Sequence, residues 1–364
     1  MNSVAVGDIL ELRYGKALKQ ADRAGGAVPV VGSGGIVGRH SVGFTESPTI
    51  VVGRKGSIGS VTWVDGPAWP LVTAYFVAPR REDIAPRWIY WMLRSLRLET
   101  MNKSAAVPGL NRDDVYRLSV ALPSPPEQRR IAAILDHADA LRANRRQVLA
   151  HLASLTESVF LDRFGEVPAT STVESVASLI RTGPFGSQLL HSEFVDSGVA
   201  VLGLDNVVNN EFRWVERRYI TPEKYEQLRR YTVRPGDVLI SIMGTTGRCV
   251  VVPADIPPAI NTKHICAITP ISTDVDSNFL RAAFLWHPDS RTHLHRQTKG
   301  SIMNGLNMGI VKAMPVPVPP VARQRLFAER VHQITEAKKV AVRAALADDG
   351  LFESLQSRAF RGEL

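Results

Sequence analysis

Cysteine and long hydrophobic runs are both scarce in this sequence of 364 residues. Its two cysteines, Cys249 and Cys266, form no C-x-x-C pair, so we expect two buried thiols in a reducing cytoplasm. No uninterrupted apolar stretch approaches the roughly 20 residues that span a bilayer. Residues 1–15 also lack the basic start and apolar run of a signal peptide. A cytoplasmic location without a membrane partner is therefore expected.

The motifs of common nucleotide-binding and catalytic sites are also missing. The run Gly32-x-Gly34-x-x-x-Gly38 lacks the G-x-G-x-x-G spacing of a dinucleotide site, and there is no G-x-x-x-x-G-K-[ST] phosphate loop. There is no Asn-Pro-Pro-Tyr run of the kind that adenine methyltransferases use. The pair His293-x-His295 has no third ligand at a spacing that suits a metal ion. These absences predict a chain with no catalytic residue, no metal site and no bound cofactor.

Positive charge is in excess. Lysine and arginine number 44 against 35 aspartates and glutamates, which gives a formal net charge of +9. Hydrophobic residues make up 45% of the chain, as in a globular protein. The surplus favours a polyanionic partner, because neutralised phosphates release their condensed counterions. The alternative, a merely basic protein with no such partner, fits the charge equally well.

The chain repeats itself, and the repeat predicts its architecture. Matching motifs recur at offsets that grow along the sequence: Gly56-x-x-Gly59 with Gly244-x-x-Gly247 at 188, Gly109-Leu110-Asn111 with Gly305-Leu306-Asn307 at 196, and Ser154-Leu155 with Ser354-Leu355 at 200. Two similar halves in one chain indicate pseudo-two-fold symmetry and a partner with two equivalent half-sites.

Each half has the same internal order of strands, a short helix, a proline-rich elbow and a long helix. Alternating Val, Ile and Thr residues predict strands on either side of each glycine turn: 49–52 and 60–64 in the first half, 237–243 and 248–252 in the second. The short helices are expected over 86–99 and 278–287. Ser124-Pro125-Pro126-Glu127 supplies a helix start for the first long helix.

The long helices carry apolar residues in steps of three and four, which is typical of a coiled-coil seam. The first is expected to run for about 30 residues, with its seam at Ile131, Ile134, Ala138, Leu141, Val148, Leu152 and Leu155. The second has its seam at Phe327, Val331, Ile334, Ala341, Ala345 and Phe352, with a break at Asp348-Asp349-Gly350 left open. We expect the two helices to pair antiparallel as a spacer; two unrelated amphipathic surface helices are the alternative.

Several segments resemble the specificity subunits of type I restriction–modification systems. The resemblance rests on residues 29–38, 48–61, 182–187 and 235–240, on the helix start 122–135, and on the C-terminal run 354–364. It covers essentially the whole chain, and the paired order of the parts is more specific than any one motif.

The resemblance implies an α+β fold with two β-rich target recognition domains, each followed by a long helix. Its parts are target recognition domain 1 (1–121), the central conserved helix (122–165), target recognition domain 2 (166–316) and the C-terminal conserved helix (317–364). It also implies a non-catalytic subunit that reads a bipartite target in double-stranded DNA. The implied partners are two methyltransferase (modification) subunits, which bind S-adenosylmethionine and methylate adenine, and motor-nuclease (restriction) subunits.

The DNA-contacting candidates are basic and polar residues in and near the glycine turns. They are Arg39, Arg54, Lys55, Ser57, Lys103 and Asn111 in the first half, and Thr245, Thr246, Arg248, Lys263, Lys299 and Asn307 in the second. In the alternative interpretation, the glycines close tight hairpins with side chains facing water, and the asparagines cap helices. Two other functions also stay open: an assembly protein that reads no bases, and an enzyme that holds phosphate in its glycine-rich turns.

Overall fold

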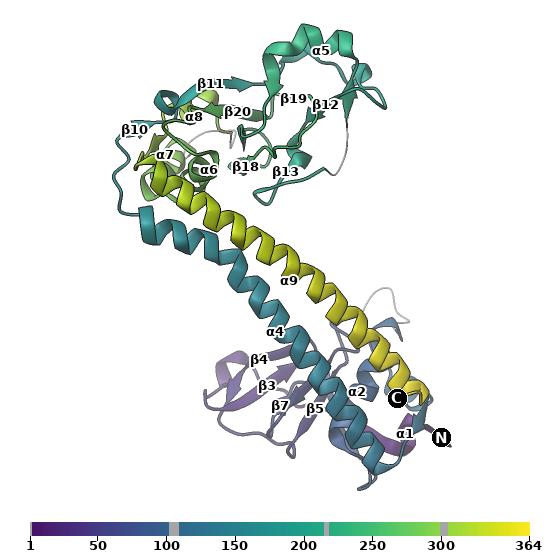
Figure 1. Cartoon of the computed structure of the whole chain (residues 1–364). Helices are drawn as coiled ribbons and strands as arrows, with labels where there is room; N and C mark the ends of the chain where they lie inside the picture. Colours follow the sequence, from purple (N-terminus) through teal and green to yellow (C-terminus); the bar gives the residue numbers. More distant parts are fainter. Residues whose placement is uncertain (1, 102–108, 215–217, 299–304) are drawn as a thin grey trace. The chain divides into compact units, whose positions relative to one another are not determined.

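The computed structural model describes residues 2–101, 109–214, 218–298 and 305–364 (Figure 1). The chain divides into two compact units. Unit 1 consists of Met1–Gln147 and Val342–Leu364, and unit 2 consists of Val148–Ala341. The boundaries of the four segments expected from the resemblance stay a prediction.

Unit 1 is built from two small sheets and a strand pair. A four-stranded antiparallel sheet has the order β2 (Leu10–Tyr14), β8 (Ala74–Pro79), β5 (Thr49–Gly53), β6 (Val61–Val64). A second sheet has the order β4 (Gly35–His40), β3 (Val28–Gly32), β7 (Trp69–Pro70), in which β3 and β7 are parallel. Strand β1 (Asn2–Ala5) pairs with β9 (Ser119–Leu122). The helices are α1 (Val6–Ile9), α2 (Pro86–Ser95) and α3 (Arg112–Tyr116), with 3₁₀ turns η1 (Gln20–Asp22) and η2 (Leu98–Met101).

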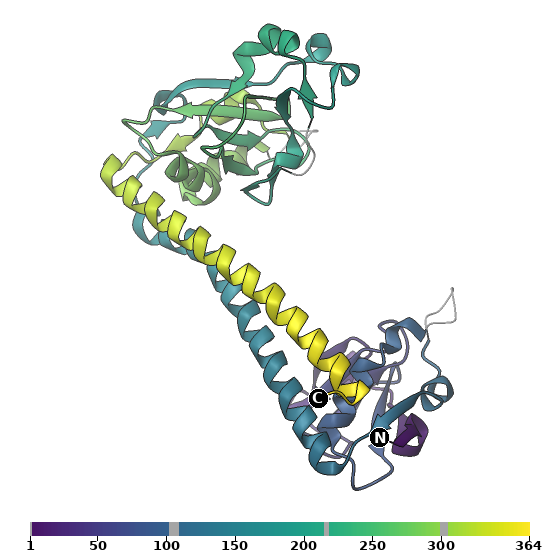
Figure 2. The same cartoon turned by 45° about the vertical axis from the view of Figure 1, so that its right-hand side comes forward.

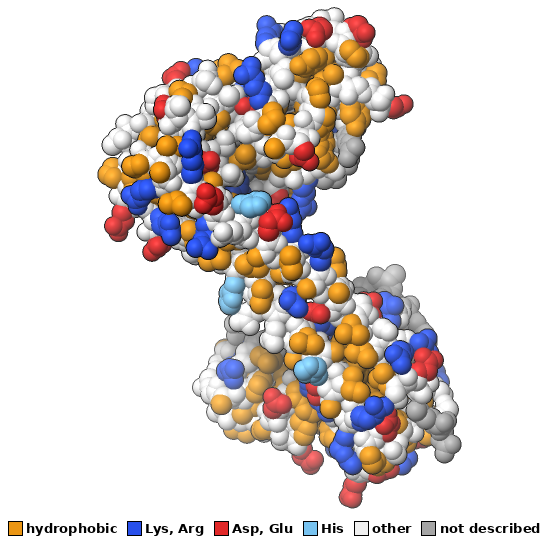
Figure 3. Space-filling view, viewed as in Figure 1, with side chains coloured by type: hydrophobic (Ala, Val, Ile, Leu, Met, Phe, Trp, Pro, Cys, Tyr) orange, Lys and Arg blue, Asp and Glu red, His pale blue; other side chains and the backbone are white. Residues whose placement is uncertain are grey.

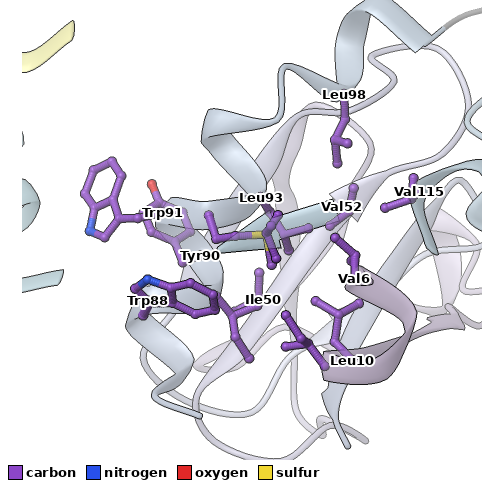
Figure 4. Close-up of a cluster of buried hydrophobic side chains, with 14 of the residues drawn as sticks. Val6, Leu10, Ile50, Val52, Trp88, Tyr90, Trp91, Leu93, Leu98 and Val115 are labelled. Carbon is purple, nitrogen blue, oxygen red and sulfur yellow. The ribbon is translucent and has the colours of Figure 1, made fainter. Parts of the chain in front are cut away.

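The main core of unit 1 lies between helix α2 and the larger sheet. Six consecutive residues of α2, from Trp88 to Leu93, are buried, and so is every residue of β5. Figure 4 shows Trp88 and Leu93 of α2 beside Ile50 and Val52 of β5. Burial of large aromatic and branched side chains contributes roughly 1.5–3 kcal/mol each. The core therefore holds the helix against the sheet whose hairpin turn carries several of the predicted DNA contacts.

Unit 2 repeats this plan. Its larger sheet has the order β11 (Ala177–Thr182), β20 (Ile265–Pro270), β17 (Val238–Ser241), β18 (Cys249–Val251). Its second sheet has the order β15 (Tyr219–Ile220), β12 (Val199–Leu202), β19 (Ala259–Asn261), β16 (Thr232–Val233), with β12 and β19 parallel. Strand β10 (Ser171–Thr172) pairs with β21 (Pro315–Val316), and β13 (Val207–Val208) pairs with β14 (Glu211–Phe212). The further helices are α5 (Pro222–Leu228), α6 (Ser277–Trp286), α7 (Pro288–Thr298) and α8 (Met308–Lys312).

The two predicted long helices are present, and the first is longer than expected. Helix α4 (Pro125–Phe164) has 40 residues rather than about 30, and α9 (Val321–Arg361) has 41. Helix α9 does not break at residues 348–350. Both aspartates there face the partner helix: Asp349 accepts a hydrogen bond from Arg142 at 2.6 Å, and Asp348 from Arg145 at 3.2 Å. Their charge is neutralised in place, so the helix continues.

The helices pair antiparallel. In unit 1 the first part of α4 contacts the last part of α9, as the Arg142–Asp349 ion pair shows. In unit 2 the last part of α4 contacts the first part of α9: Phe160 near the end of α4 packs on Phe327 near the start of α9, with ring centres 5.6 Å apart. Figures 1 and 2 both show the two helices side by side.

The prediction was wrong for three residues of the seam on α4. Leu141, Val148 and Leu155 are 42%, 44% and 40% exposed, whereas the seam prediction buries them. An α-helix drifts by about 20° per heptad against a seven-residue repeat, so a stripe kept in strict heptads turns away from a partner that does not supercoil with it. Ile131, Ala138, Phe327, Val331, Ile334, Ala341 and Phe352 are buried, and Ile134, Leu152 and Ala345 are half-buried.

A buried glutamine fixes the start of each long helix. Gln128 accepts a hydrogen bond from the backbone N–H of Ala85 at 2.8 Å and donates to the carbonyl of Pro123 at 3.0 Å. Gln324 does the same with Asp276 at 2.9 Å and Pro319 at 2.7 Å. Ala85 and Asp276 are the N-cap residues of α2 and α6. Each glutamine therefore ties a long helix to the short helix of its own unit.

Candidate nucleic-acid interface

The glycine turns have the same backbone geometry in both units. In unit 1 the N–H of Gly53 bonds the carbonyl of Ser60, and the N–H of Gly59 bonds that of Gly53, both at 2.8 Å. Gly56 and Gly59 have φ values of 78° and 71°, which residues with a side chain rarely adopt.

In unit 2 the N–H of Ser241 donates to the carbonyl of Arg248, and the N–H of Gly247 donates to the carbonyl of Ser241, both at 2.9 Å. Gly244 and Gly247 have φ values of 74° and 79°. The glycines therefore serve the backbone in both halves, and the side chains between them are where the two turns differ.

A second turn lies against each glycine turn. In unit 1 this turn spans 71–74, and its Thr73 carbonyl accepts from the N–H of Arg54 at 2.9 Å. In unit 2 it spans 262–265, and its His264 carbonyl accepts from the N–H of Ile242 at 2.9 Å.

The Gly-Leu-Asn motif completes the arrangement in each unit. The N–H of Leu110 donates a hydrogen bond to the backbone carbonyl of Arg54, and the N–H of Leu306 donates one to the backbone carbonyl of Ile242, both at 2.9 Å. We call residues 53–59, 71–74 and 109–111 the first loop edge, and residues 241–247, 262–265 and 305–307 the second loop edge.

At the base of each loop edge lies a glycine at a position where no side chain would fit. A Cβ atom on Gly15 would lie 2.2 Å from the carbonyl oxygen of Leu71, and one on Gly183 would lie 2.0 Å from that of Asn261. Backbone atoms cannot move away as a flexible side chain can. The close approach of these backbones therefore requires glycine at both equivalent positions.

At the first loop edge, the predicted residues differ in how firmly they are held. Lys55 and Ser57 are exposed. Arg54 is half-buried and donates from Nε and Nη2 to the carbonyl of Val72 at 3.2 and 2.8 Å. Arg39 is not part of this edge: it pairs with Pro29 in the β3–β4 hairpin, away from the hairpin tip at residues 33–34, and donates to the carbonyl of Ala27 at 2.8 Å.

The two asparagines are helix caps. Asn111 accepts from the N–H of Asp113 at 2.9 Å and begins α3. Asn307 accepts from the N–H of Ile310 at 2.9 Å and begins α8. Their side-chain oxygens are thus engaged at the N-caps, which matches the capping alternative for both residues.

At the second loop edge, basic residues stand at different positions. Thr245 and Lys263 are exposed, and Thr246 and Arg248 are half-buried. His264, next to Lys263, has its pKa lowered by burial and by the nearby charges of Lys263 and Arg218. This imidazole is therefore biased towards its neutral form, which can both donate and accept a hydrogen bond. Lys103 and Lys299 lie outside the described residues.

Two residues beside the first loop edge were missed by the sequence analysis. Tyr14, at the end of β2, is 51% exposed, and Arg112 follows the cap residue Asn111. The guanidinium carbons of Arg54 and Arg112 lie 5.1 and 5.2 Å from the centre of the Tyr14 ring. Tyr14 is far from both arginines in sequence, so only the strand register reveals the cluster.

Neither a metal centre nor a membrane span is found where the structure is described. Over residues 2–101, 109–214, 218–298 and 305–364, no three His, Cys, Asp or Glu side chains are grouped to hold a metal ion. No helix within these ranges has the length and apolar character needed to cross a bilayer. Burial raises the pKa of the thiols of Cys249 and Cys266 to about 12.

Comparison with known proteins gives a consistent result. A family model described as the type I restriction modification DNA specificity domain matches residues 1–152 and 201–343. The specificity subunit of the type I restriction enzyme EcoBI from Escherichia coli is 24% identical over 349 residues, covering 86% of this chain and 73% of that protein. The EcoDI specificity subunit from the same organism is 22% identical over 406 aligned residues, covering 100% and 88%.

Solved structures show the same fold. The S subunit of a type I restriction–modification system from M. genitalium superposes with a TM-score of 0.65 at 16% identity, covering 99% of this chain and 96% of that one. A chain from a study of complex assembly in the type I system gives 0.60 at 14% identity, covering 100% and 98%.

The family model matches far more than half of the chain, and both β-rich units and both long helices have the expected form. Specificity subunits of this family are non-catalytic and bind no cofactor; S-adenosylmethionine lies on the methyltransferase partner. The chain belongs to the type I restriction–modification DNA specificity family and is the DNA specificity subunit of such a system.

Proposed function

We propose that each loop edge binds one half of a bipartite target in double-stranded DNA. The observation that carries the proposal is the shared backbone frame: the same hydrogen bonds join the same three segments in both units, while the side chains differ. A repeated scaffold with different side chains suits two half-sites of different sequence, since scaffold contacts position the protein and side chains read bases. The net charge of +9 supports a polyanionic partner.

The residues proposed to contact DNA follow from their exposure. Lys55 and Ser57 at the first loop edge, and Thr245 and Lys263 at the second, have side chains open to solvent. Thr246 and Arg248 are half-buried beside them. Asn111 and Asn307 are proposed to act through the caps they form rather than through bases. Lys103 and Lys299 remain candidates from the sequence alone.

Helices α4 and α9 are proposed to act as the spacer and as the platform for two methyltransferase subunits. Leu141, Val148 and Leu155 follow one another at intervals of seven residues and are exposed, which forms an apolar stripe on α4. Leu346 and Leu351 of α9 are 68% and 51% exposed. Figure 3 shows hydrophobic side chains at the surface over the helix pair. Exposed apolar stripes of this kind fit the amphipathic helices of a partner. Motor-nuclease subunits would join the resulting cytoplasmic complex.

Sequencing of modified adenines tests the proposal. The chain is co-expressed with a type I methyltransferase subunit from the same genome, and genomic DNA is read for methylated adenines. The expected result is one motif of two short half-sites separated by a gap of fixed length, with no methylation when this chain is omitted. Methylation with no bipartite motif, or catalytic turnover by the isolated chain, would contradict the proposal.

A further inference from the structure

Two tyrosines and two arginines form a cluster: Arg54 belongs to the first loop edge, and Tyr14, Tyr75 and Arg112 lie beside it. The rings of Tyr14 and Tyr75 are 5.2 Å apart between centres. The Arg54 guanidinium lies 5.1 Å from the first ring centre and 5.8 Å from the second, and that of Arg112 lies 5.2 Å from the Tyr14 ring. Arginines within about 6 Å of an aromatic ring are held there by the attraction of the cation to the π-face.

Arg54 is fixed in orientation by a second contact. Its Nε and Nη2 both donate to the carbonyl of Val72, so the side edge of the guanidinium is occupied. Within the described residues, Nη1 has no hydrogen-bond partner, so the end edge of the fork stays available. The side chain of Arg112 makes no hydrogen bond or ion pair within the described residues, so only its ring contact restrains it. One arginine is therefore locked and the other is loosely held.

The second loop edge has no such cluster, although its backbone is equivalent. Strand register pairs Tyr14 with Tyr75 and, in the other unit, Thr182 with Cys266. The bonds from Leu110 and Leu306 make Ile242 the counterpart of Arg54. Arg112 corresponds to Met308, because each follows the cap asparagine of its helix. The four cationic and aromatic positions of unit 1 are thus small or apolar in unit 2.

We propose that Arg54 reads a guanine in the half-site bound by unit 1, while Arg112 contacts a neighbouring phosphate. This inference rests on the proposed function of the loop edges. The end edge of a guanidinium matches a pair of adjacent acceptors, and guanine presents O6 and N7 as such a pair in the major groove. Phosphate oxygens form a similar pair, but a locked fork discriminates by direction and suits a base edge. The loosely held Arg112 suits a phosphate, which accepts from many directions.

Motif sequencing with single variants tests this proposal. Complexes carrying Arg54→Lys or Arg54→Ala are compared with wild type. Arg81→Ala is the control, because Arg81 is an exposed arginine beyond the end of β8 that is opposite the loop edge, and within the described residues it pairs only with Asp83. The Arg54 variants are expected to relax one guanine of one half-site, so that discrimination at that position falls roughly 10- to 100-fold. The other half-site and the gap are expected to stay unchanged, and Arg81→Ala to keep the whole motif.

A second measurement leaves the protein intact. Duplexes in which that guanine is replaced by 7-deazaguanine lack the N7 acceptor but keep the base pair. Wild-type complex is expected to bind them roughly tenfold more weakly, and the Arg54→Ala complex to show no further loss.

Several results overturn the inference. One is a wild-type motif with no G·C pair in either half-site, and another is equal binding of wild type to the deazaguanine duplex. A third is an Arg54 variant that lowers methylation at all sites without changing the motif, which would make Arg54 a phosphate contact. These outcomes leave the proposed function standing, because the bipartite motif is still present. A wild-type complex with no bipartite motif overturns both.

Discussion

At the scale of single residues, the glycines of the loop edges fall into two classes. Gly59 has positive φ and no room, since a Cβ would lie 2.3 Å from the backbone nitrogen of Glu99. Gly247, its counterpart, has positive φ with nothing within 4 Å of the Cβ position. The repeated Gly-x-x-Gly motif predicts the tight turns correctly, but it does not distinguish these two environments. That difference depends on η2, which packs against the turn in unit 1.

The two glycines provide a matched test. Gly247→Ala is expected to cost roughly 1–2 kcal/mol of stability from backbone strain alone. Gly59→Ala is expected to cost about 1–3 kcal/mol more, because the new methyl group must displace backbone atoms. The midpoints of thermal unfolding, measured by calorimetry on the two variants, would show the difference as a larger decrease for Gly59→Ala. Equal midpoints would contradict the steric explanation.

The buried glutamines make a second prediction at this scale. Gln128→Ala leaves the N–H of Ala85 and the carbonyl of Pro123 without their partner in a buried place. We expect a loss of about 2 kcal/mol or more, since unpaired buried polar groups cost roughly 1–3 kcal/mol each. Gln147→Ala is the control, because that side chain is exposed and makes no hydrogen bond within the described residues; it should change stability by less than about 0.5 kcal/mol. Chemical denaturation measures the free energy of unfolding of both variants. Equal losses would argue against a stabilising role of the hydrogen bonds made by Gln128.

At the scale of elements, periodic patterns of apolar residues correctly predicted the positions of most of the expected strands and helices. The strands around both glycine turns and the short helices α2 and α6 lie within a few residues of their expected positions, and both long helices are present. The heptad pattern nevertheless misplaced Leu141, Val148 and Leu155, because sequence spacing cannot reveal where a helix stops following its partner. The length of α4 was underestimated, since the continuation to Phe164 depends on aromatic packing with Phe279 and Phe327 at 5.0 and 5.8 Å.

The spacer role predicts how the helix length sets the gap in the target. Seven residues inserted after Gln147 in α4, and seven after Arg343 in α9, would lengthen both helices together. At 1.5 Å per residue this adds roughly 10 Å, or about three base pairs at 3.4 Å each. Sequencing of methylated adenines should then show the same half-sites with a longer gap. Replacement of residues 147–153 by another helical heptad is the matched control and should keep the gap; an unchanged gap after insertion would refute the spacer.

At the scale of the whole molecule, the repeat predicted two similar units, but not the chemistry at each loop edge. Tyr14 and Arg54 are 40 positions apart and meet only because β2 and β5 both pair with β8. A pattern search cannot find such a cluster, since the contact depends on strand register between distant segments. Asn111 and Asn307, in contrast, follow from local sequence, because N-caps are defined by the residues that come directly after them.

The excess positive charge predicts a salt-dependent interaction. If the two loop edges neutralise about four phosphates, the affinity of the assembled complex for duplex DNA should fall roughly 100-fold between 50 and 200 mM salt. Lys55→Ala and Lys263→Ala should each reduce the slope of log K against log salt by about one if the lysine contacts a phosphate. Fluorescence anisotropy on a labelled duplex provides the measurement. A slope that neither substitution changes would show that these two lysines do not contact the phosphate backbone of the DNA.

The paired glutamine elbows have a consequence for how such chains diversify. Gln128 and Gln324 join each long helix only to groups of its own unit, and the same bonds recur in both halves. A recombination event that exchanged the strand-rich part of one unit for that of a related chain would carry the short helix along and find the same attachment on the helix. We therefore expect a hybrid chain that carries the strand-rich part of a related subunit to fold, and to combine one new half-site with the half-site of the unit that stayed unchanged.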